Sequence, residues 1–448
     1  MKMPVTPQKL ATYLDTHLEC DCGHEHYASL KAVEVGEGTL EKLPQLLKEL
    51  GFKSLYLIAD SITNKIAGKR TMAILERAGI KAVIRVLTHV AFDEATVGEL
   101  LIHKPDDCDV CVAVGTGSIN DMTRFFSFRC GLPFITVATA APMDGFASTI
   151  AALNVENLKT TFPAQAPAAV IGDTDILKEA PYPMIAAGLG DLLGKFTCLC
   201  DWKLAKIIIG EHYCANIVNL TENCVRNVLA GADKAKDRDP KVIGEIMEGL
   251  VLSGVCMSLA GNSRPASGCE HHMSHYWEMM FEQAHKRPAP HGIQVSVATV
   301  LVLKLVEALL KRDIDFDDAR AKARSYDRTA WEAEIRAAYG PAAPGVIAME
   351  NKAKKNDTAG CLKRLDAIEA NWDEIRGLLA DLPKSQDVAN LLKGLSAPCT
   401  PAEIEVDSQL LKRTFLYCKE VRDRYTIFQL AWDLGLLDEL SDEVIASV

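Results

Sequence analysis

The chain has 448 residues, of which 48% are hydrophobic and 24% charged, a mixture typical of a soluble globular protein with two domains. Its formal net charge of −11 argues against nucleic acid or an anionic membrane as a partner, because both require clustered cations. No uninterrupted apolar run approaches the roughly 20 residues of a membrane helix, and the N-terminal MKMPVTPQKL lacks the apolar core of a secretion signal. The 14 cysteines follow no disulfide spacing, so we expect reduced thiols and a cytoplasmic protein.

The first part of the chain alternates short apolar segments with amphipathic ones. Segments 54–60, 81–87, 109–115 and 132–139 are predicted strands, and the amphipathic stretch 64–79 is a predicted helix. Continuously apolar strands that alternate with helices predict a parallel sheet covered on both faces. Ligands of such sheets bind beyond the carboxyl ends of the strands.

A stretch rich in proline and alanine, from Phe162 to Pro183, interrupts this alternation, and most of the sequence after it has helical periodicity. We therefore predict an α/β domain over residues 1–178, with residues 1–32 as an N-terminal flap, and an all-helical domain over residues 179–448. The charged segment from Arg312 to Pro398 is a predicted helical elaboration of the second domain.

A short glycine-containing segment, GTGSIND, begins at Gly115, directly after a predicted strand, and opens a predicted helix. Its glycines allow backbone amides to approach a phosphate at the helix N-terminus, although Asn120 replaces the third glycine of a G-x-G-x-x-G motif. A nucleotide loop and an ordinary tight turn are both consistent with this pattern. Asp60, at the end of an earlier strand, fits either ribose binding or helix capping, and Asp144, after the strand at 132–139, fits either substrate binding or a turn cap.

Three histidines fall within five residues of the stretch SGCEHHMSH. His271 and His275 are one helical turn apart and share a face, whereas His272 is rotated away from them. A Pro-His-Gly tripeptide places His291 at the start of another predicted helix. This pattern favours a metal site, which needs a carboxylate from a further helix. Asp191 is the best candidate, because a solitary carboxylate in its apolar helix would be costly.

Two further segments contain groups that bind ligands in other proteins. CDCGHEH, from Cys20 to His26, holds two cysteines and two histidines, but its spacing differs from that of zinc fingers, and we expect a surface flap over the α/β domain instead of a metal site. Ser263 and Arg264, in the segment NSRPAS, precede the histidines and fit an anion site, although ordinary helix capping by Ser263 fits equally well.

Together these motifs resemble the bacterial branch of the sn-glycerol-1-phosphate dehydrogenase family, within the superfamily of glycerol dehydrogenases, dehydroquinate synthases and iron-type alcohol dehydrogenases. The resemblance covers essentially the whole chain and rests on GTGSIND at 115, TAAPMDGFAS at 139, AGLGDLLGKFTCLCDW at 187, SRPASGCEHHMSHYWEM at 263, PHG at 290 and RTFLYCKEVRDRYTIFQLAWDLGLLDE at 413. It implies an N-terminal NAD(P)-binding α/β domain with a parallel sheet, an all-α C-terminal domain, and an active site in the cleft between them.

The resemblance also implies roles for individual residues. The implied ligands of one divalent metal ion, zinc or nickel, are Asp191, His271 and His291. Asp144 is the implied catalytic carboxylate on the substrate side, and His275 lines the pocket and is a candidate for the proton relay. The predicted contacts to NAD(H) or NADP(H) are Asp60, Gly115, Gly117, Ser118, Asp121 and Thr139. The predicted contacts to a substrate phosphate are Ser263 and Arg264.

The implied reaction is the reversible reduction of dihydroxyacetone phosphate to sn-glycerol 1-phosphate by NAD(P)H, with a metal that polarises the ketone. A glycerol dehydrogenase acting on unphosphorylated glycerol or dihydroxyacetone and a cyclase like dehydroquinate synthase are the alternatives. The SRPAS segment favours a phosphorylated substrate, and the intact ligand positions disfavour a non-enzymatic binding protein. We expect a small-molecule substrate, no nucleic acid, no membrane insertion, and a homo-oligomer that is at least a dimer.

Overall fold

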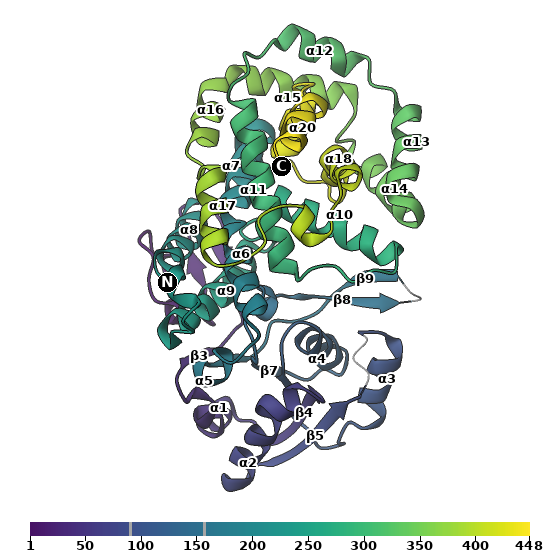
Figure 1. Cartoon of the computed structure of the whole chain (residues 1–448). Helices are drawn as coiled ribbons and strands as arrows, with labels where there is room; N and C mark the ends of the chain where they lie inside the picture. Colours follow the sequence, from purple (N-terminus) through teal and green to yellow (C-terminus); the bar gives the residue numbers. More distant parts are fainter. Residues whose placement is uncertain (89–91, 156–157) are drawn as a thin grey trace. The chain divides into compact units, whose positions relative to one another are not determined.

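The computed structural model describes residues 1–88, 92–155 and 158–448 of the chain (Figure 1). Their contacts group them into two compact units. Unit 1 comprises Met1–Leu192 and Asn216–Ser263, and unit 2 comprises Leu193–Ala215 and Arg264–Val448. Unit 1 therefore combines the predicted α/β region with helices from later in the sequence. The domain boundary at residue 178 stays a prediction.

A parallel six-stranded sheet forms the framework of unit 1, which confirms the predicted α/β fold. Its strands, in the order β3-β10-β7-β6-β4-β5, are β3 (Ala32–Gly36), β10 (Ala169–Asp173), β7 (Phe134–Val137), β6 (Val110–Val114), β4 (Ser54–Asp60) and β5 (Lys81–Leu87). The four predicted strands are β4 to β7. Strands β6, β7 and β10 are buried along their whole length, as the centre of a sheet covered on both faces requires.

Two strands of the sheet were not predicted, β3 and β10. Strand β10 lies within the stretch that was predicted to end the alternation, so that prediction is wrong at this point. Its five residues are too few to show a period, and parallel pairing with β3 on one side and β7 on the other defines it. Two antiparallel pairs complete the strands, namely β1 (Leu18–Glu19) with β2 (Glu25–His26) and β8 (Ile150–Val155) with β9 (Leu158–Pro163).

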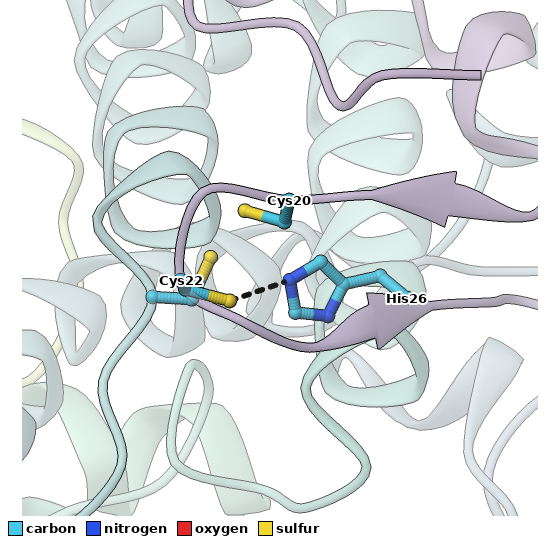
Figure 2. A group of neighbouring side chains, drawn as sticks. Cys20, Cys22 and His26 are labelled. Atoms are coloured by element: carbon cyan, nitrogen blue, oxygen red, sulfur yellow. Dashed lines mark hydrogen bonds between the residues drawn. The ribbon is translucent and has the colours of Figure 1, made fainter.

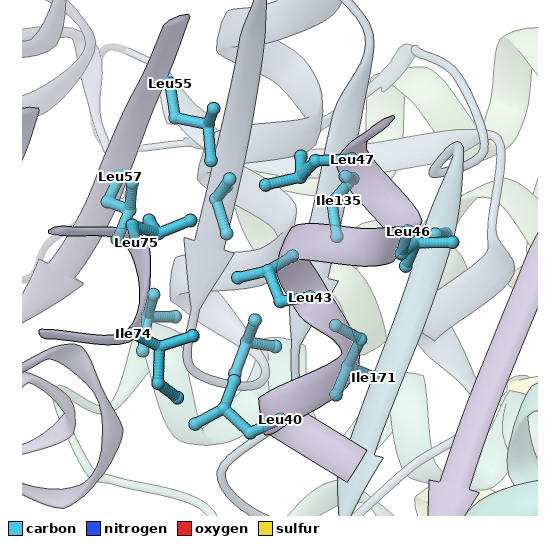
Figure 3. Packing of buried hydrophobic residues seen from close by; sticks show 14 of the residues in the cluster. Leu40, Leu43, Leu46, Leu47, Leu55, Leu57, Ile74, Leu75, Ile135 and Ile171 are labelled. Carbon is cyan, nitrogen blue, oxygen red and sulfur yellow. The ribbon is translucent and has the colours of Figure 1, made fainter. Parts of the chain in front are cut away.

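Amphipathic helices pack against the sheet and together with it form the core of unit 1. In α1, Leu43, Leu46 and Leu47 are buried together with Leu57 of β4 and Ile135 of β7 (Figure 3). Each such leucine stabilises the fold by about 1.5–3 kcal/mol relative to an exposed one. The helices that lie in unit 1 are α1 (Leu43–Leu50), α2 (Lys69–Arg77), α3 (Glu94–Ile102), α4 (Ser118–Arg129), α5 (Thr174–Leu177), α6 (Tyr182–Leu193), α8 (Ala215–Ala230) and α9 (Pro240–Ala260).

Unit 2 consists of helices, which confirms the predicted helical region and its charged elaboration. Its helices are α7 (Lys195–Ile209), α10 (Cys269–Gln283), α11 (His291–Leu309), α12 (Phe316–Arg324), α13 (Arg328–Tyr339), α14 (Ala343–Ala353), α15 (Thr358–Ala370), α16 (Trp372–Ala380), α17 (Ser385–Gly394), α18 (Ser408–Tyr417), α19 (Ile427–Asp433) and α20 (Leu437–Ala446). The terminal helical pattern is interrupted before α19. There, Arg264 donates to the carbonyl of Tyr425, and the amide of Ile427 donates to Asp201, which starts a new helix.

Three helical segments are long and apolar enough to cross a membrane by length and composition alone: Tyr182–Ile209, Pro240–Ala260 and His291–Leu309. Buried residues make up 83%, 78% and 89% of their most apolar windows, so packing inside the protein accounts for their composition. The absence of membrane insertion stays a prediction.

Candidate active site

The histidine segment forms helix α10 of unit 2, and His291 is the first residue of α11 in the same unit. The ring centroid of His291 lies 5.2 Å from that of His271 and 5.6 Å from that of His275. His272 is fully buried, and neither of its ring nitrogens has a hydrogen-bond partner in the part of the chain that the structure describes. The structure thus brings together His271, His275 and His291, the three histidines that were predicted to share a site.

Two carboxylates of α10 orient these imidazole rings. Glu270 Oε1 lies 2.7 Å from Nδ1 of His271, and the two oxygens of Glu278 lie 3.1 Å from Nδ1 of His291 and 3.2 Å from Nδ1 of His275. A carboxylate at Nδ1 fixes the tautomer in which Nε2 is the ring atom that can ligate a metal. The donor pair of His271 and His291 therefore fits a divalent ion.

The carboxylate of Glu270 is held in its ionised form. It is fully buried, and burial by itself would raise its pKa. Hydrogen bonds from His271, from Thr197 Oγ1 at 2.6 Å and from the amide of Gly268 at 2.8 Å hold that pKa below its usual value. At neutral pH a negative charge therefore lies next to His271, where it strengthens the imidazole as a metal ligand.

Asp201 of α7 positions the start of α10. Its two carboxylate oxygens accept hydrogen bonds from the amides of Cys269 and Ile427, both at 2.7 Å. Burial and the charge of Glu270 raise its pKa to about 7. An added Cβ at Gly268 would lie 2.6 Å from both Asp201 Oδ2 and Cys198 Cα, so only glycine fits directly before the histidine helix.

His275 is a neutral imidazole at neutral pH. Burial is the largest cause that lowers its pKa to about 4, and the neighbouring His291 and His271 add to this effect while Glu278 opposes it. A neutral ring can accept a proton through one nitrogen while it donates through the other. This is the property that a proton relay requires.

The two predicted carboxylates of the site, Asp191 and Asp144, lie in unit 1 and are joined to each other. Asp191 is on α6, and Asp144 is in the loop after β7. The amide of Asp144 donates to Asp191 Oδ2 at 2.8 Å, and Ser253 Oγ of α9 donates to Asp144 Oδ2 at 2.8 Å. These hydrogen bonds offset part of the cost of burying the two carboxylates. Of the three predicted ligands, His271 and His291 thus lie together in unit 2, and Asp191 lies in unit 1.

The glycine-containing segment joins β6 to α4 in unit 1. Gly117 has φ of +49° and ψ of −115°, which L side chains rarely adopt, and a Cβ at Gly115 would lie 2.8 Å from Ile119 Cβ. Ser118 is exposed at the N-terminus of α4, where backbone amides favour a phosphate. Asn120, in place of the third glycine, accepts a hydrogen bond from Thr136 of β7 at 2.7 Å. This hydrogen bond joins α4 to β7, where the third glycine of the motif would instead allow close packing of helix and strand. These residues fit a nucleotide pyrophosphate.

The other predicted cofactor contacts have more local partners. Asp60 Oδ1 accepts hydrogen bonds from the amides of Ile62 and Thr63, both at 2.7 Å, so this carboxylate caps the following helix. A contact to a ribose would use its other oxygen. Asp121 forms an ion pair with the buried Arg124. Thr139 is buried just beyond the carboxyl end of β7.

The predicted phosphate contacts have mixed support in the structure. Arg264 is 2% exposed and donates to Glu211 at 2.7 Å and to the carbonyl of Tyr425 at 2.9 Å, so a phosphate would compete with Glu211 for the guanidinium. Two further cations donate to the neighbouring segment: Lys195 to the carbonyl of Ala266 at 3.0 Å, and Arg424 to the carbonyl of Ser267 at 3.2 Å.

Three residues that contact the predicted site residues were missed from the sequence: Glu270, Glu278 and Ser253. The position of Glu278, three residues after His275 on the same helix, is a signal that could have found it, because such residues share a face. Ser253 is 109 residues from Asp144, and no local pattern connects the two.

The chain is similar to known proteins over most of its length. A family model described as iron-containing alcohol dehydrogenase matches residues 34–181. The chain is similar to the glycerol-1-phosphate dehydrogenase (NAD(P)+) of Geobacillus stearothermophilus, with 31% identity over 427 residues that cover 94% of this chain and 97% of the relative. The protein of that name from Bacillus velezensis is 35% identical over 403 residues, 89% of this chain and 90% of the relative. Among solved structures, glycerol dehydrogenase from Schizosaccharomyces pombe has a TM-score of 0.60 at 15% identity, over 94% of this chain and 92% of that one, which concerns the fold alone.

Proposed function

The chain belongs to the glycerol-1-phosphate dehydrogenase family, and we propose that it interconverts dihydroxyacetone phosphate and sn-glycerol 1-phosphate by hydride transfer with NAD(P). It is an NAD(P)-linked, metal-dependent oxidoreductase. The observation that carries the assignment of the site is the pair of imidazoles, His271 and His291, each oriented at Nδ1 by a carboxylate.

We propose Asp191, His271 and His291 as the ligands of one divalent ion, zinc or nickel. The two histidines present a donor pair that suits either metal, and a buried carboxylate is the further ligand that a site with an open position requires. When bound, the ion polarises the ketone, and the reduced nicotinamide supplies the hydride. An active site in a cleft between the predicted domains stays a prediction.

The chain's own residues would then bind, orient and move a proton. The hydrogen bond from Ser253 holds Asp144, which we propose lies on the substrate side. The Nδ1 of His275 lies against Glu278, so its Nε2 would accept the proton of the alcohol during oxidation. During reduction, Nε2 would first take a proton from solvent and then pass it to the product oxygen. Gly115, Gly117 and Ser118 would hold the pyrophosphate of the nucleotide at the N-terminus of α4.

The remaining assignments rest on position. Asp60 ends β4 and Thr139 lies just after β7, at the edge where nucleotides bind to parallel sheets. Asp121 lies in the first turn of α4, the helix that follows β6. Ser263 and Arg264 are the proposed phosphate contacts, and the basic groups of Lys195 and Arg424 next to the same segment support an anion there.

A substrate panel tests the proposed function. Dihydroxyacetone phosphate and dihydroxyacetone are each supplied with NADH or NADPH, after chelation and reloading with zinc or nickel, and the product is resolved by chiral analysis. We expect turnover of the phosphorylated ketone, loss of turnover after chelation, and a single enantiomer. Full activity of a completely metal-stripped protein would refute the metal-dependent mechanism, and preference for dihydroxyacetone would favour a glycerol dehydrogenase.

Two variants locate the metal. His271→Ala is expected to lose both bound metal and turnover. His285→Asn changes an exposed histidine just beyond the end of α10 and is expected to keep both, so it controls for the loss of any imidazole.

We also propose that the chain forms a homo-oligomer, at least a dimer, and acts in the cytoplasm. Light scattering of the purified protein tests the first proposal, and fractionation of cells tests the second. A mass equal to that of one 48.9 kDa chain at micromolar concentration would contradict the oligomer.

A further inference from the structure

The N-terminal hairpin of unit 1, formed by β1 and β2, gathers three side chains that bind metals in other proteins. Leu18 of β1 lies opposite His26 of β2, and the connection between the strands carries Cys20 and Cys22. The amide of Gly23 donates to the carbonyl of Cys20 at 3.0 Å, and Gly23 has φ of +85°, so the connection folds back tightly. Figure 2 shows the result: both thiols lie beside the imidazole of His26.

The distances between these donor atoms approach those of a tetrahedral zinc site. Cys22 Sγ lies 3.3 Å from His26 Nε2, and the ligand atoms of Cys20, Cys22 and His26 lie within 4.8 Å of one another. With Zn–S of about 2.3 Å and Zn–N of about 2.0 Å, two ligand atoms at tetrahedral angles are about 3.5–3.8 Å apart. Small side-chain rotations would therefore bring the three atoms onto one ion.

The imidazole of His26 is already in the orientation of a ligand. It is 2% exposed, and its Nδ1 lies 2.7 Å from the carbonyl oxygen of Leu259, near the end of α9. Because a carbonyl oxygen only accepts, Nδ1 carries the hydrogen, and the lone pair of Nε2 faces the thiol of Cys22. A backbone carbonyl that fixes the tautomer in this way is a common partner of metal-bound histidine.

The sulfur of Cys20 also has a partner that suits a thiolate. Asn216 Nδ2, at the start of α8, donates to Cys20 Sγ at 3.4 Å. A donor of this kind stabilises negative charge on sulfur, and the thiolate is the form that binds metal.

We propose that Cys20, Cys22 and His26 bind a structural zinc ion that joins the N-terminal hairpin to the end of α9. Two thiolates and an imidazole are the donors that select zinc over hard cations such as magnesium. The spacing of CDCGHEH differs from that of zinc fingers, and four ligands within its seven residues would require an unusually tight chain fold around the ion. In the structure His24 is exposed, so the hairpin supplies three ligands and the steric objection no longer holds.

A structural zinc site takes four ligands, so one further donor is required. Cys214 stands two residues before Asn216 in the sequence and is the nearest thiol to it along the chain. A count of the sulfur atoms around the ion decides whether Cys214 contributes.

Metal analysis and X-ray absorption of the purified full-length protein test the proposal. We expect zinc bound in addition to the active-site metal, with scattering from sulfur at about 2.3 Å, which a site made of Asp191, His271 and His291 cannot produce. The His271→Ala variant is expected to keep this zinc and its sulfur signal, so failure of the proposed active site would be distinguishable. In that variant, which lacks the active-site metal, two sulfur atoms per zinc ion match the hairpin alone, and three add Cys214.

Variants within the hairpin provide the matched comparison. Cys22→Ser and His26→Gln are each expected to lower the zinc content by about one ion per chain, because each removes one ligand of the site. His24→Gln, in the same connection but exposed, is expected to leave it unchanged. Release of about one zinc ion per chain from the unmodified protein by a mercurial thiol reagent tests the same point without any variant. Wild-type zinc without sulfur scattering, or full zinc content in folded Cys22→Ser, would overturn the proposal.

Discussion

Replacement of Gly188 by alanine is expected to damage both the stability of unit 1 and the geometry of its two carboxylates. Gly188 lies on α6, three residues before Asp191, and faces the loop that carries Asp144. An added Cβ at Gly188 would lie 2.1 Å from the carbonyl oxygen of Ala141 and 3.1 Å from Leu250 Cδ1. The carbonyl belongs to the backbone and cannot move away by a side-chain rotation.

The size of the effect follows from these distances. A carbon atom and a carbonyl oxygen come no closer than about 3.3 Å without strain, so the helix or the loop must shift by about 1 Å. Overpacking of this kind costs about 1–3 kcal/mol, and the contact with the backbone favours the upper value. The same shift would break the 2.8 Å hydrogen bond from the amide of Asp144 to Asp191. A displacement of about 1 Å in a catalytic group lowers turnover by about 100-fold.

Urea unfolding and steady-state kinetics measure the two effects separately. We expect Gly188→Ala to lose about 3 kcal/mol of unfolding free energy and about 100-fold in kcat/KM for dihydroxyacetone phosphate. Gly98→Ala, on α3, is the control, because no neighbouring atom lies within 4 Å of the added Cβ. That control is expected to be as stable as the natural protein or up to about 1 kcal/mol more stable. If Gly188→Ala behaved like this control in both assays, the argument from the close approach would be refuted.

Three further changes test individual contacts. Ser253→Ala removes the hydrogen bond to Asp144 and should cost about 1–3 kcal/mol in transition-state stabilisation, measured as kcat/KM. Ser258→Ala, on the same helix, should leave kcat/KM unchanged. Equal kcat/KM values for the two variants would contradict the role of Ser253. Glu278→Gln weakens the contacts that orient His275 and His291 and should lower metal affinity by about 10–100-fold in a chelator competition. Unaltered metal affinity would exclude this orienting role of Glu278. Burial would raise the pKa of Glu420, but Lys355 and Lys419 lower it from 4.5 to about 2. Its ionised form therefore stabilises the fold above pH 4.5, and this contribution is lost as the pH falls towards 2. Glu420→Gln leaves two buried lysines without a carboxylate, so it should lower the unfolding free energy by about 3–5 kcal/mol at pH 7 and reduce its dependence on pH. Urea unfolding between pH 2 and 7 measures both, and an unaltered pH dependence would contradict the role of Glu420.

Local periodicity by itself was enough to predict much of this protein. Strands β4, β6 and β7 were found because buried parallel strands are continuously apolar, and the edge strand β5 was found from its valines and isoleucine. His271 and His275 were separated from His272 because 3.6 residues per turn determine which side chains share a helix face. The turn between β6 and α4 was found because glycines directly after a predicted strand allow a tight turn into a helix, whereas phosphate binding by this turn stays a prediction. Each of these features depends on residues close together in the chain.

Features that join distant residues were decided by the tertiary structure. Strand β10 has no periodic signal of its own and exists because β3 and β7 flank it. The hydrogen bond from Ser253 to Asp144 spans 109 residues, and that from His26 to Leu259 spans 233. Such contacts depend on how each segment packs against the others, and no spacing of residues in one chain records that packing. The CDCGHEH segment shows the difference most clearly, since its composition was visible in the sequence, whereas the direction of His26 towards Leu259 required the folded chain.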